Sequence, residues 1–495
     1  MNENTVTLAL PGRYCHVDEI RLLPMSDNHN NCLQVIPWTQ RYHKNTSMRI
    51  AGRVFIVRAP LEKRSLVIVI EAPDIADCGI TMYTDRVKLD PCGCTYFKKE
   101  CPAGTEEAEL RAYFRARMPM PLFAMVNNWG DRHQGVNVCE EFCLAEIDAA
   151  ADLGLDVVQI DDGWQSTPPG DVRIFDAEGN YTFYHAFDGS FWDVNTKKFP
   201  NGLEPLAKRA KERGIRLGLW FAPDSRGDFA NFERDLAVLK NAYDMGFRYF
   251  KLDMVNLLHM SERDRFLEFL RAVQAFGDDI YLQIDVTGGT PRLGFTDGTS
   301  FGKLFVENRY TLNRDYLPFA TLSALWQLSR YMPAQRFQFE LPNRRMYTDS
   351  YDADDPLSPM HYTSDWQLAS LLVCCPLFWM EIQHFDPEDA KTVKPLLDIW
   401  KRERDALAAC DIRPVGALPD GIAMTGFAAD GDGYGYAVAL SEVTDEKELR
   451  FSMAKPVQSF EILYTNTKAE VSVSGCAVTV TLPDPRAYAF IRFTC

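Results

Sequence analysis

The middle of the chain alternates apolar runs with amphipathic stretches, and this alternation constrains the fold more than any other feature. A strand–helix pattern repeated in this way requires parallel strands joined by helical crossovers, and eight such units close into a (β/α)8 TIM barrel. The helical periodicity is clearest at 140–153, 203–213, 229–245 and 262–276. The predicted strands are 122–128, 157–161, 216–221, 249–253, 280–284, 303–306, 336–339 and 377–380.

The segments on either side of this block have the pattern of β-domains. Residues 1–117 alternate short β-rich runs with Pro, Asn and Gly turns, and helical spacing first persists at 105–117. After about residue 410 strand-like runs return at 434–440, 461–464, 477–482 and 489–493, separated by turns. We therefore predict three domains: an N-terminal β-sandwich-like domain (1–117), the barrel (118–410) and a small C-terminal antiparallel β-sandwich domain (411–495).

Charge and hydropathy exclude several classes of partner. The chain has 69 acidic and 53 basic residues, a formal net charge of −16, whereas nucleic acids and anionic membranes select basic surfaces. The N-terminus lacks a basic segment followed by a long apolar one, and no uncharged run reaches the roughly 18 residues of a membrane span. We expect a cytoplasmic protein that binds neither nucleic acid nor membrane. The sequence does not decide whether the protein forms a homo-oligomer.

The cysteine pattern indicates free thiols. The count of 13 is odd, and Cys139, Cys143, Cys374 and Cys375 stand at positions typical of buried apolar side chains. A small cluster at residues 92–101 contains three further cysteines, but no other Cys or His stands at the spacing of a zinc site. The sequence therefore predicts no disulfide framework, no metal and no organic cofactor.

Charged and aromatic residues follow the predicted strands. Because the carboxyl ends of barrel strands share one mouth, we expect these side chains to lie together. Indole faces stack on sugar rings, while carboxylates, Lys and Arg bond sugar hydroxyls, so the pattern predicts a saccharide site. The residues concerned are Trp129, Asp131, Asp161, Asp162, Trp164, Trp220, Asp224, Lys251, Asp253, Asp285, Glu307, Asn308, Arg309 and Glu381.

Two strand ends carry the most specific signals. Lys251 and Asp253 point to the same side of one strand, and the positive charge favours the ionised carboxylate that a nucleophile needs. The alternative is a surface ion pair, but the neighbouring apolar residues indicate burial. Asp161 and Asp162 form a tight carboxylate pair, which repels itself unless a ligand or a cation shares it. The alternative interpretation of Asp161 is a helix N-cap.

Four segments in this order resemble the glycoside hydrolase family 36 α-galactosidases. They are 157–165 with Asp-Asp-Gly-Trp, 192–203 with Lys-Phe-Pro-Asn-Gly-Leu, 216–224 with Trp-Phe-Ala-Pro, and 249–253 with Lys-Leu-Asp. The resemblance covers about residues 119–410. It implies that Asp161 and Asp162 bind the O4 and O6 hydroxyls of galactose, that Lys251 contacts ring hydroxyls, and that Asp253 is the nucleophile. It also makes Arg226 the nearest match to a sugar-binding arginine.

The departures from the family concern the acid/base and the sugar's 2-substituent. Glu307 stands where the family has its acid/base Asp, and we predict that role for it; the alternative is a structural carboxylate paired with Arg309. Asp285 stands where the family has a Cys near the 2-substituent, and a carboxylate prefers a hydroxyl there to an acetamido group. Asp285 is also the alternative acid/base. The N-terminal domain is shorter than in many family members.

The sequence thus predicts a retaining exo-acting α-glycosidase, foremost an α-galactosidase that hydrolyses terminal α-galactosides by double displacement. The alternatives are a raffinose-synthase-like transglycosidase, an α-N-acetylgalactosaminidase and, from another class, a carbohydrate-binding protein with weakened catalysis. The predicted partner is an oligosaccharide or glycoside substrate. The predicted catalytic residues are Asp253 and Glu307, and the predicted substrate-binding residues are Asp161, Asp162, Trp164, Lys251, Trp220, Arg226, Asp285 and Trp129.

Overall fold

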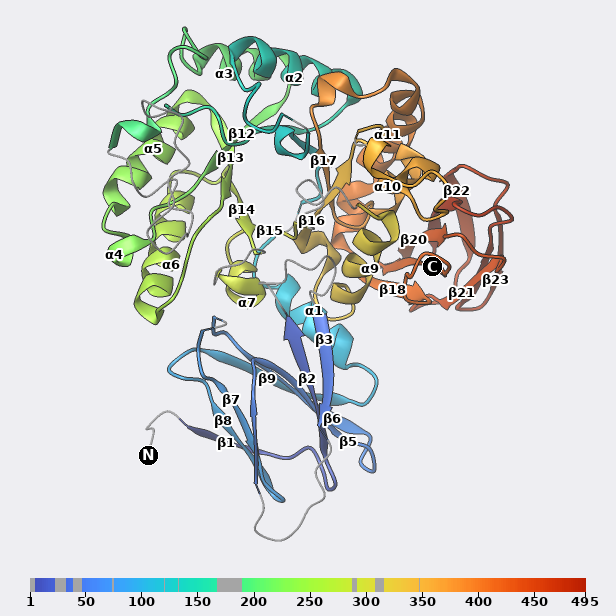
Figure 1. The fold of residues 1–495 in the computed structure, drawn as a ribbon. Helices are drawn as coiled ribbons and strands as arrows, with labels where there is room; N and C mark the ends of the chain where they lie inside the picture. Colours follow the sequence, from blue (N-terminus) through green and yellow to red (C-terminus); the bar gives the residue numbers. More distant parts are fainter. Residues whose placement is uncertain are drawn as a thin grey trace.

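A computed structural model describes residues 5–22, 33–38, 47–73, 75–119, 121–131, 133–166, 189–286, 292–307, 316–346 and 348–495. A closed parallel barrel occupies the middle of the chain, with antiparallel sheets before and after it in the sequence. The N-terminal sheets lie below the barrel and the C-terminal sheets beside it in Figure 1. The predicted fold class, a (β/α)8 barrel flanked by two β-rich parts, is confirmed.

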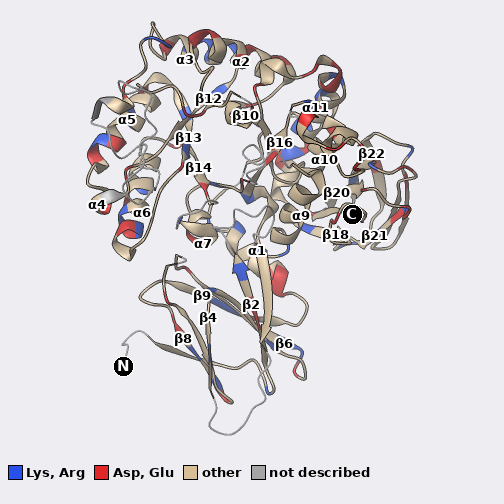
Figure 2. Ribbon diagram, in the orientation of Figure 1, with Lys and Arg blue, Asp and Glu red and all other residues tan. Residues whose placement is uncertain are grey.

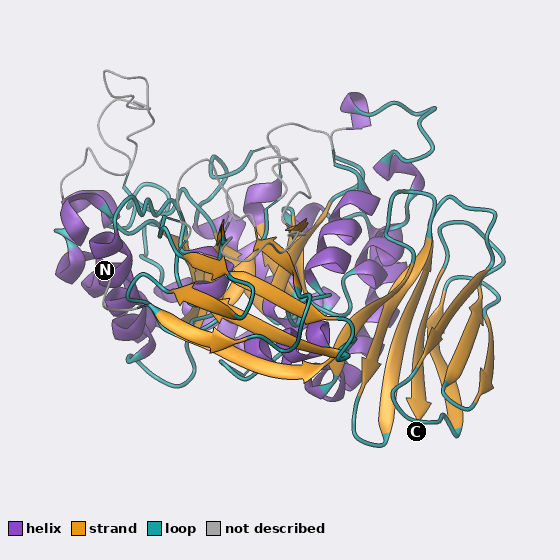
Figure 3. Cartoon of the chain, turned by 90° about the horizontal axis from the view of Figure 1, so that it is seen from below, coloured by secondary structure: helices purple, strands orange, loops and turns teal. Residues whose placement is uncertain are grey.

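The barrel strands follow one another around the barrel in sequence order, and the last pairs with the first. Their side chains are almost all buried on both faces, as expected where helices surround a closed sheet (Figure 3). The first strand begins at Met125, later than predicted, and ends at Asn127, whose side chain accepts from the Trp129 backbone N–H and starts a turn. The strands are β10 (Met125–Asn127), β11 (Val157–Ile160), β12 (Arg216–Phe221), β13 (Phe247–Leu252), β14 (Tyr281–Asp285), β15 (Lys303–Phe305), β16 (Phe337–Pro342) and β17 (Cys375–Trp379).

Two of the outer helices, α2 and α3, end where the sequence supplies a glycine. Gly154 and Gly214 follow α2 and α3 with φ of 99° and 71°, left-handed values that favour glycine. The predicted helix 229–245 begins only at Phe232, because Phe229, the last residue of the preceding short turn, has a positive φ of 60°. The helices are α1 (Glu106–Arg115), α2 (Glu140–Leu153), α3 (Glu204–Arg213), α4 (Arg226–Phe229), α5 (Phe232–Met245), α6 (Met260–Gln274), α7 (Gly294–Gly298), α9 (Pro318–Leu328), α10 (Ser364–Ser370) and α11 (Pro387–Ala409).

Short 3-10 turns connect several of these elements. They are η1 (Asn128–Gly130), η2 (Gly189–Trp192), η3 (Ala334–Arg336), η4 (Thr348–Ser350), η5 (Pro359–His361) and η6 (Ile382–His384). Two of them, η1 and η6, follow the first and last barrel strands at the mouth, and η3 precedes β16 at the opposite end.

The N-terminal part packs one sheet on another. A four-stranded sheet has the order β1-β8-β7-β4 and a five-stranded sheet the order β3-β2-β5-β6-β9. An apolar core that includes Phe55, Ile68 and Leu89 lies between them. The strands are β1 (Val6–Ala9), β2 (His16–Leu22), β3 (Leu33–Trp38), β4 (Met48–Ala51), β5 (Val54–Ala59), β6 (Arg64–Ile70), β7 (Gly79–Met82), β8 (Arg86–Asp90) and β9 (Tyr96–Pro102).

The C-terminal part also has two antiparallel sheets, with orders β18-β19-β20-β25-β22 and β21-β24-β23. Two of its strands lacked a clear sequence signal: β18 contains a proline and β23 is half-exposed along its length. The strands are β18 (Asp411–Gly416), β19 (Met424–Asp430), β20 (Tyr434–Ser441), β21 (Glu448–Ser452), β22 (Ser459–Thr465), β23 (Glu470–Ser474), β24 (Ala477–Thr481) and β25 (Tyr488–Thr494).

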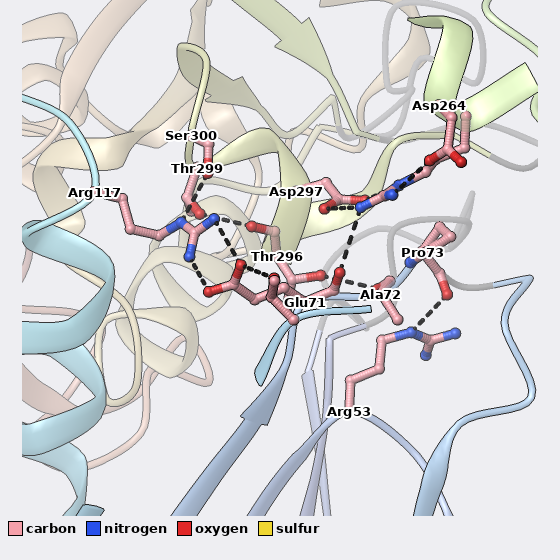
Figure 4. A network of polar contacts seen from close by, with 12 residues as sticks. Arg53, Glu71, Ala72, Pro73, Arg117, Asp264, Thr296, Asp297, Thr299 and Ser300 are labelled. Atoms are coloured by element: carbon pink, nitrogen blue, oxygen red, sulfur yellow. Dashed lines mark hydrogen bonds and ion pairs between the residues drawn. The ribbon is translucent and has the colours of Figure 1, made fainter. Parts of the chain in front are cut away.

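A polar network joins the N-terminal sheets to the barrel (Figure 4). Arg117, just after α1, bonds the Glu71 carboxylate and donates to Ser300 Oγ at 2.8 Å. Arg263 of α6 forms a bidentate pair with Asp297 of α7 at 2.8 and 2.9 Å. The N-terminal sheets and α7 are therefore held together by charged groups from three elements of the chain.

The surface carries both charge signs. Acidic and basic residues alternate along outer helices such as α3 and α6 (Figure 2), and Arg209 of α3 pairs with Asp148 of α2 at 2.8 Å. Within the ranges that the structure describes, no helix has the length and apolar character needed to cross a bilayer.

The cysteines of the described ranges are free thiols, and Cys143, Cys374 and Cys375 are buried as predicted. Cys139 corrects the expectation: it is half-buried, because it stands at the N-terminal boundary of α2 rather than inside the helix.

Candidate active site

A lysine at the mouth of the barrel lies between two carboxylates. Lys251 is the fifth residue of β13, and its Nζ lies 3.0 Å from Asp161 Oδ2 and 3.5 Å from Asp253 Oδ2. The Lys251 and Asp161 side chains are each 2% exposed. Burial alone would lower the pKa of Lys251, but the charges of Asp161 and Asp253 outweigh it and raise that pKa above its ordinary value. Lys251 is thus a permanent cation.

The carboxylate of Asp253 accepts bonds from three directions. Its Oδ2 accepts from Trp220 Nε1 at 3.1 Å, and its Oδ1 lies 3.3 Å from Arg292 Nη1. The backbone N–H of Met254 also donates to Oδ1, with Met254 in the left-handed region at φ 53°. Burial would raise the pKa of Asp253, but the charges of Lys251 and Arg292 and the hydrogen bonds it accepts hold it well below its usual range. Asp253 is therefore ionised.

The carboxylates of Asp161 and Asp162 have different partners. Its Oδ2 is shared by Lys251 and by Asn127 Nδ2, which donates at 2.6 Å. Asp162 is less buried, and Gln165 bonds its Oδ1. A cation therefore shares the deeper carboxylate, and the shallower one has its own amide partner, so the repulsion between them is relieved. Each acid of the pair has a distinct environment.

Two more carboxyl groups stand beside this centre. Asp285 is the last residue of β14 and hydrogen-bonds the Asp253 carboxylate. Because two carboxyl groups can share a hydrogen bond only if a proton lies between them, Asp285 donates when Asp253 is ionised. Glu307 follows β15, is 6% exposed, and in its ionised form helps to raise the pKa of Lys251. The predicted site carboxylates thus surround one lysine.

Two of the predicted indoles, Trp164 and Trp220, are packed into the wall of the site. Trp164 and Trp220 are each only 2% exposed and pack against Trp192 at ring-centroid distances of 5.9 and 6.0 Å. The Trp164 Nε1 donates to the Trp220 carbonyl at 3.1 Å. These rings form a packed wall, and Trp220 contacts Asp253 through its N–H. Trp129 remains half-exposed.

The structure adds residues that the sequence did not identify. Arg292 contacts the same carboxylate as Lys251 but comes from a segment without a strand signal, seven residues after Asp285. Asn127 is the last residue of β10, and a polar residue at the end of an apolar strand gives no functional signal by itself. The Lys251 ammonium also lies 5.3 Å from the Phe305 ring centre and 5.2 Å from that of Trp379. The side chain of Arg226, and Asn308 and Arg309, lie outside the described residues.

A second acidic group occupies the seam between the first and last strands. Ligand atoms of Asp131, Glu381 and His384 all lie within 4.8 Å of one another, so these residues could hold a cation. Glu381 Oε2 lies 2.8 Å from His384 Nδ1, and the Glu381 backbone N–H donates to Asp131 Oδ2 at 3.3 Å. Burial and the charge of Asp131 raise the pKa of Glu381. Asp131 and Glu381 thus lie together at the mouth as predicted, in contact with each other, and Glu381 also contacts His384.

Sequence comparisons find α-galactosidases. A family model described as Melibiase matches residues 110–237. Alpha-galactosidase AgaA of Geobacillus stearothermophilus is 34% identical over 100 residues, which are 20% of this chain and 12% of that protein. Alpha-galactosidase Mel36A of Lactobacillus acidophilus is 34% identical over 104 residues, again 20% of this chain and 12% of the relative. The matched stretch therefore spans 12% of the length of these two relatives.

Solved structures share the whole fold. The GH36 α-galactosidase AgaA superposes with a TM-score of 0.66 at 13% identity, covering 99% of this chain and 76% of that one. The α-galactosidase from Lactobacillus brevis gives a TM-score of 0.70 at 12% identity, covering 99% and 75%. Together with the melibiase segment, these likenesses confirm the resemblance predicted from the sequence. Residues 110–237 thus resemble the melibiase family in sequence, and the chain as a whole shares the fold of the GH36 α-galactosidases.

Proposed function

We propose that the protein is a retaining exo-acting α-glycosidase with Asp253 as the nucleophile, and that its substrates are terminal α-galactosides. The observation that carries the proposal is the set of contacts around Asp253: two cations and an indole N–H keep this carboxylate ionised at the carboxyl end of a barrel strand. An ionised carboxylate held in a buried site is what attack on an anomeric carbon requires.

The reaction runs in two displacements. Asp253 attacks the anomeric carbon, a glycosyl ester forms, and the glycosidic bond breaks while Glu307 gives its proton to the leaving oxygen. Glu307, now ionised, takes a proton from water, the water oxygen attacks the same carbon, and the ester bond to Asp253 breaks. Configuration is retained, because both displacements invert it. The acid of the first step is the base of the second.

Glu307 suits the acid/base role better than Asp285 does. In retaining enzymes the two carboxyl groups stand about 5–5.5 Å apart, so that the anomeric carbon and the leaving oxygen fit between them. Asp285 is in hydrogen-bond contact with Asp253, which leaves no such room. A donor bond from Asp285 instead stabilises the charge of the nucleophile, and its other contacts can include a sugar hydroxyl.

The substrate class follows from the deeper acids and from the relatives. Asp161, Asp162 and Lys251 present acceptors and a donor that suit the hydroxyls of a terminal sugar. Two variants of the GH36 α-galactosidase AgaA are described in complex with raffinose and with stachyose. Asp285 favours a hydroxyl over an acetamido group, which supports galactose over N-acetylgalactosamine. Transfer to an acceptor sugar uses the same two steps, with a sugar hydroxyl in place of water. We also place the protein in the cytoplasm.

The test is release of 4-nitrophenol from aryl α- and β-glycosides of galactose, N-acetylgalactosamine, glucose, xylose and arabinose. We expect turnover of the α-galactoside, and its loss in Asp253→Ala. In Glu307→Gln, hydrolysis of raffinose should fall roughly 10²–10⁴-fold, while an activated aryl galactoside, which needs little protonation, loses less. Asp285→Asn is the matched control, and a raffinose-specific loss there would move the acid role to Asp285.

A carbohydrate-binding protein is the competing function, favoured by the Glu at the acid/base position. It predicts that galactose binds in calorimetry while every aryl glycoside stays intact. Hydrolysis with raffinose present as an acceptor measures transfer against hydrolysis, and a dominant transfer product would identify a transglycosidase.

A further inference from the structure

The segment that carries Arg292 is held from outside the barrel. We propose that the N-terminal β-domain is part of the catalytic apparatus: through α7 it fixes Arg292 against Asp253, so that Arg292 is a positioning residue for the nucleophile. This inference rests on the proposed function of Asp253.

Arg292 depends on its backbone for its position. Its side chain is 8% exposed and Nη1 lies 3.3 Å from Asp253 Oδ1. Its buried Nε has no hydrogen-bond partner among the residues that the structure describes. A guanidinium that is fixed by several acceptors keeps its place even if the chain moves, whereas among the described residues Arg292 has one side-chain contact, at 3.3 Å. Where the segment before α7 lies therefore decides whether Arg292 reaches Asp253.

Helix α7 begins two residues after Arg292 and is fixed to the N-terminal domain. Thr296 Oγ1 donates to the Ala72 carbonyl at 3.2 Å, from the segment that follows β6. Arg263 of α6 pairs with Asp297 through both oxygens and reaches the Glu71 carbonyl at 3.4 Å. Figure 4 shows these contacts converging on one side of α7, and all five residues of the helix are buried.

The end of α7 is fixed by the same N-terminal residue. Glu71 bonds Arg117, whose Nε donates to Ser300 Oγ at 2.8 Å, two residues beyond the helix. Burial would raise the pKa of Glu71, but bonds from Arg117, Thr95 and Tyr113 lower it, so the carboxylate is charged. Two successive residues of the N-terminal domain, Glu71 and Ala72, thus hold α7 along its length. The helix cannot shift without breaking bonds between domains.

The charge balance at Asp253 makes this position matter. Lys251 is shared with Asp161, so Arg292 is the second cation that offsets the acids of the mouth. If the Arg292 contact is lost, Asp253 keeps only Lys251, a cation that it shares with Asp161. The pKa of Asp253 must then rise. The groups that act there are Trp220 of β12, Lys251 of β13, Asp285 of β14 and Arg292, with Asp161 and Glu307 acting through Lys251.

The first variants test Arg292 itself, with the pH dependence of kcat/KM on an aryl α-galactoside as the readout. In Arg292→Met we expect kcat/KM to fall roughly 10²-fold. The acidic limb of the profile should move up by about one pH unit. Arg292→Lys, which keeps the charge, should recover part of both changes. An unchanged acidic limb in Arg292→Met overturns the inference.

The second pair of variants tests the contacts that hold α7, through its pair with Arg263, whose Nη2 also reaches the Glu71 carbonyl of the N-terminal domain. Asp297→Asn weakens the bidentate pair with Arg263 and should lower kcat/KM roughly tenfold and shift the acidic limb in the same direction. Asp148→Asn is the matched control, because Asp148 forms a bidentate pair with Arg209 between α2 and α3. We expect no shift of the limb in the control. A lower melting temperature in Asp297→Asn with an unmoved limb would mean a purely structural bond and overturn the link.

A binding measurement separates this inference from the proposed function. The imino sugar 1-deoxygalactonojirimycin, which a related GH36 enzyme binds, is a cation at neutral pH and pairs best with an ionised nucleophile. As the solution is acidified, binding measured by calorimetry should weaken in both proteins. In Arg292→Met this weakening should begin at a higher pH than in the wild type. A wild type that neither binds it nor hydrolyses a galactoside contradicts the proposed function. A normal wild type with an unshifted Kd profile in Arg292→Met contradicts only the role of Arg292.

Discussion

Two buried lysines at opposite ends of the barrel show how much a counter-charge matters. Lys251 at the mouth and Lys303 at the amino-terminal end of β15 are each 2% exposed. Two carboxylates raise the pKa of Lys251, whereas burial lowers the pKa of Lys303, which donates to the Gln335 carbonyl at 2.6 Å. Equal burial therefore gives opposite shifts, and the neighbouring charges decide the direction.

Arg336 repeats the contrast at the same end of the barrel. It is fully buried, donates to the Phe114 and Met118 carbonyls, and burial together with the charge of Arg117 lowers its pKa to about 9. Within the described ranges no ion pair joins Lys303 or Arg336 to a carboxylate. At the mouth, opposite charges thus stabilise the ionised side chains that the proposed reaction uses. At the opposite end, the buried cations lower the stability of the fold.

The largest effect should come from removing the paired cation. Lys251→Met leaves Asp161 and Asp253 buried without their shared charge, so the free energy of unfolding should fall by about 3–5 kcal/mol. Activity on an aryl α-galactoside should be lost, because the pKa of Asp253 rises. Urea unfolding and steady-state kinetics measure both. Lys251→Arg is the control, and a Met variant that unfolds like the wild type would show that the pair contributes nothing.

The prediction from sequence was strongest where one strand carried the whole signal. Lys251 and Asp253 were paired correctly because residues two apart share a face of a strand, and the eight-strand barrel followed from a repeated period. Arg292 could not be identified, because its partner is 39 residues away and its position is set by α7 and the N-terminal domain. The indole packing of Trp164 and Trp220 likewise depends on Trp192, which no local pattern links to them.

The next largest effect on the free energy of unfolding should come from Glu146, a buried carboxyl group without a cation beside it in the described part of the chain. Burial raises the pKa of Glu146 on α2 to about 7, although the Ile382 and Gln383 backbone N–H groups donate to it at 3.0 and 2.9 Å. The unfolded value is about 4.3, so the folded state binds the extra proton. Its stability is then fully present below about pH 4 and declines as the pH rises to about 7, by at most about 3 kcal/mol.

The variant Glu146→Gln should flatten this pH dependence. Urea unfolding at several pH values between 4 and 8 measures it, with Glu141→Gln, an exposed residue in the first turn of the same helix, as the control. An equally steep decline in the Gln variant would assign the effect to another group, such as the neighbouring Glu381, whose pKa is also raised.

Removing the unpaired cation should have the opposite sign and a smaller size. Lys303→Met takes away a charge without a counter-ion and keeps an apolar stem, so we expect the free energy of unfolding to rise by about 1–2 kcal/mol at pH 7. The gain is fully present below the lowered folded pKa of Lys303 and disappears above about pH 10.4, where the unfolded lysine is also neutral. Activity should be unchanged. A destabilised Met variant would show that the bond to Gln335 outweighs the cost of the buried charge.

The smallest effect should come from a neutral bond near the same end. The Tyr249 hydroxyl bonds Gln338 Oε1 at 2.5 Å, and the Tyr249 ring packs edge-on against Phe123 at 5.4 Å, the ring that also lies under Lys303 Nζ. Tyr249→Phe keeps the ring contact and leaves the amide oxygen without its donor. The free energy of unfolding should fall by about 1 kcal/mol, independent of pH between 5 and 9. Tyr249→Phe should thus destabilise the protein, because the tyrosine hydroxyl has a hydrogen-bond partner. Lys303→Met should stabilise it, because the lysine lacks a counter-charge. Equal signs for the two variants in urea unfolding would contradict that distinction.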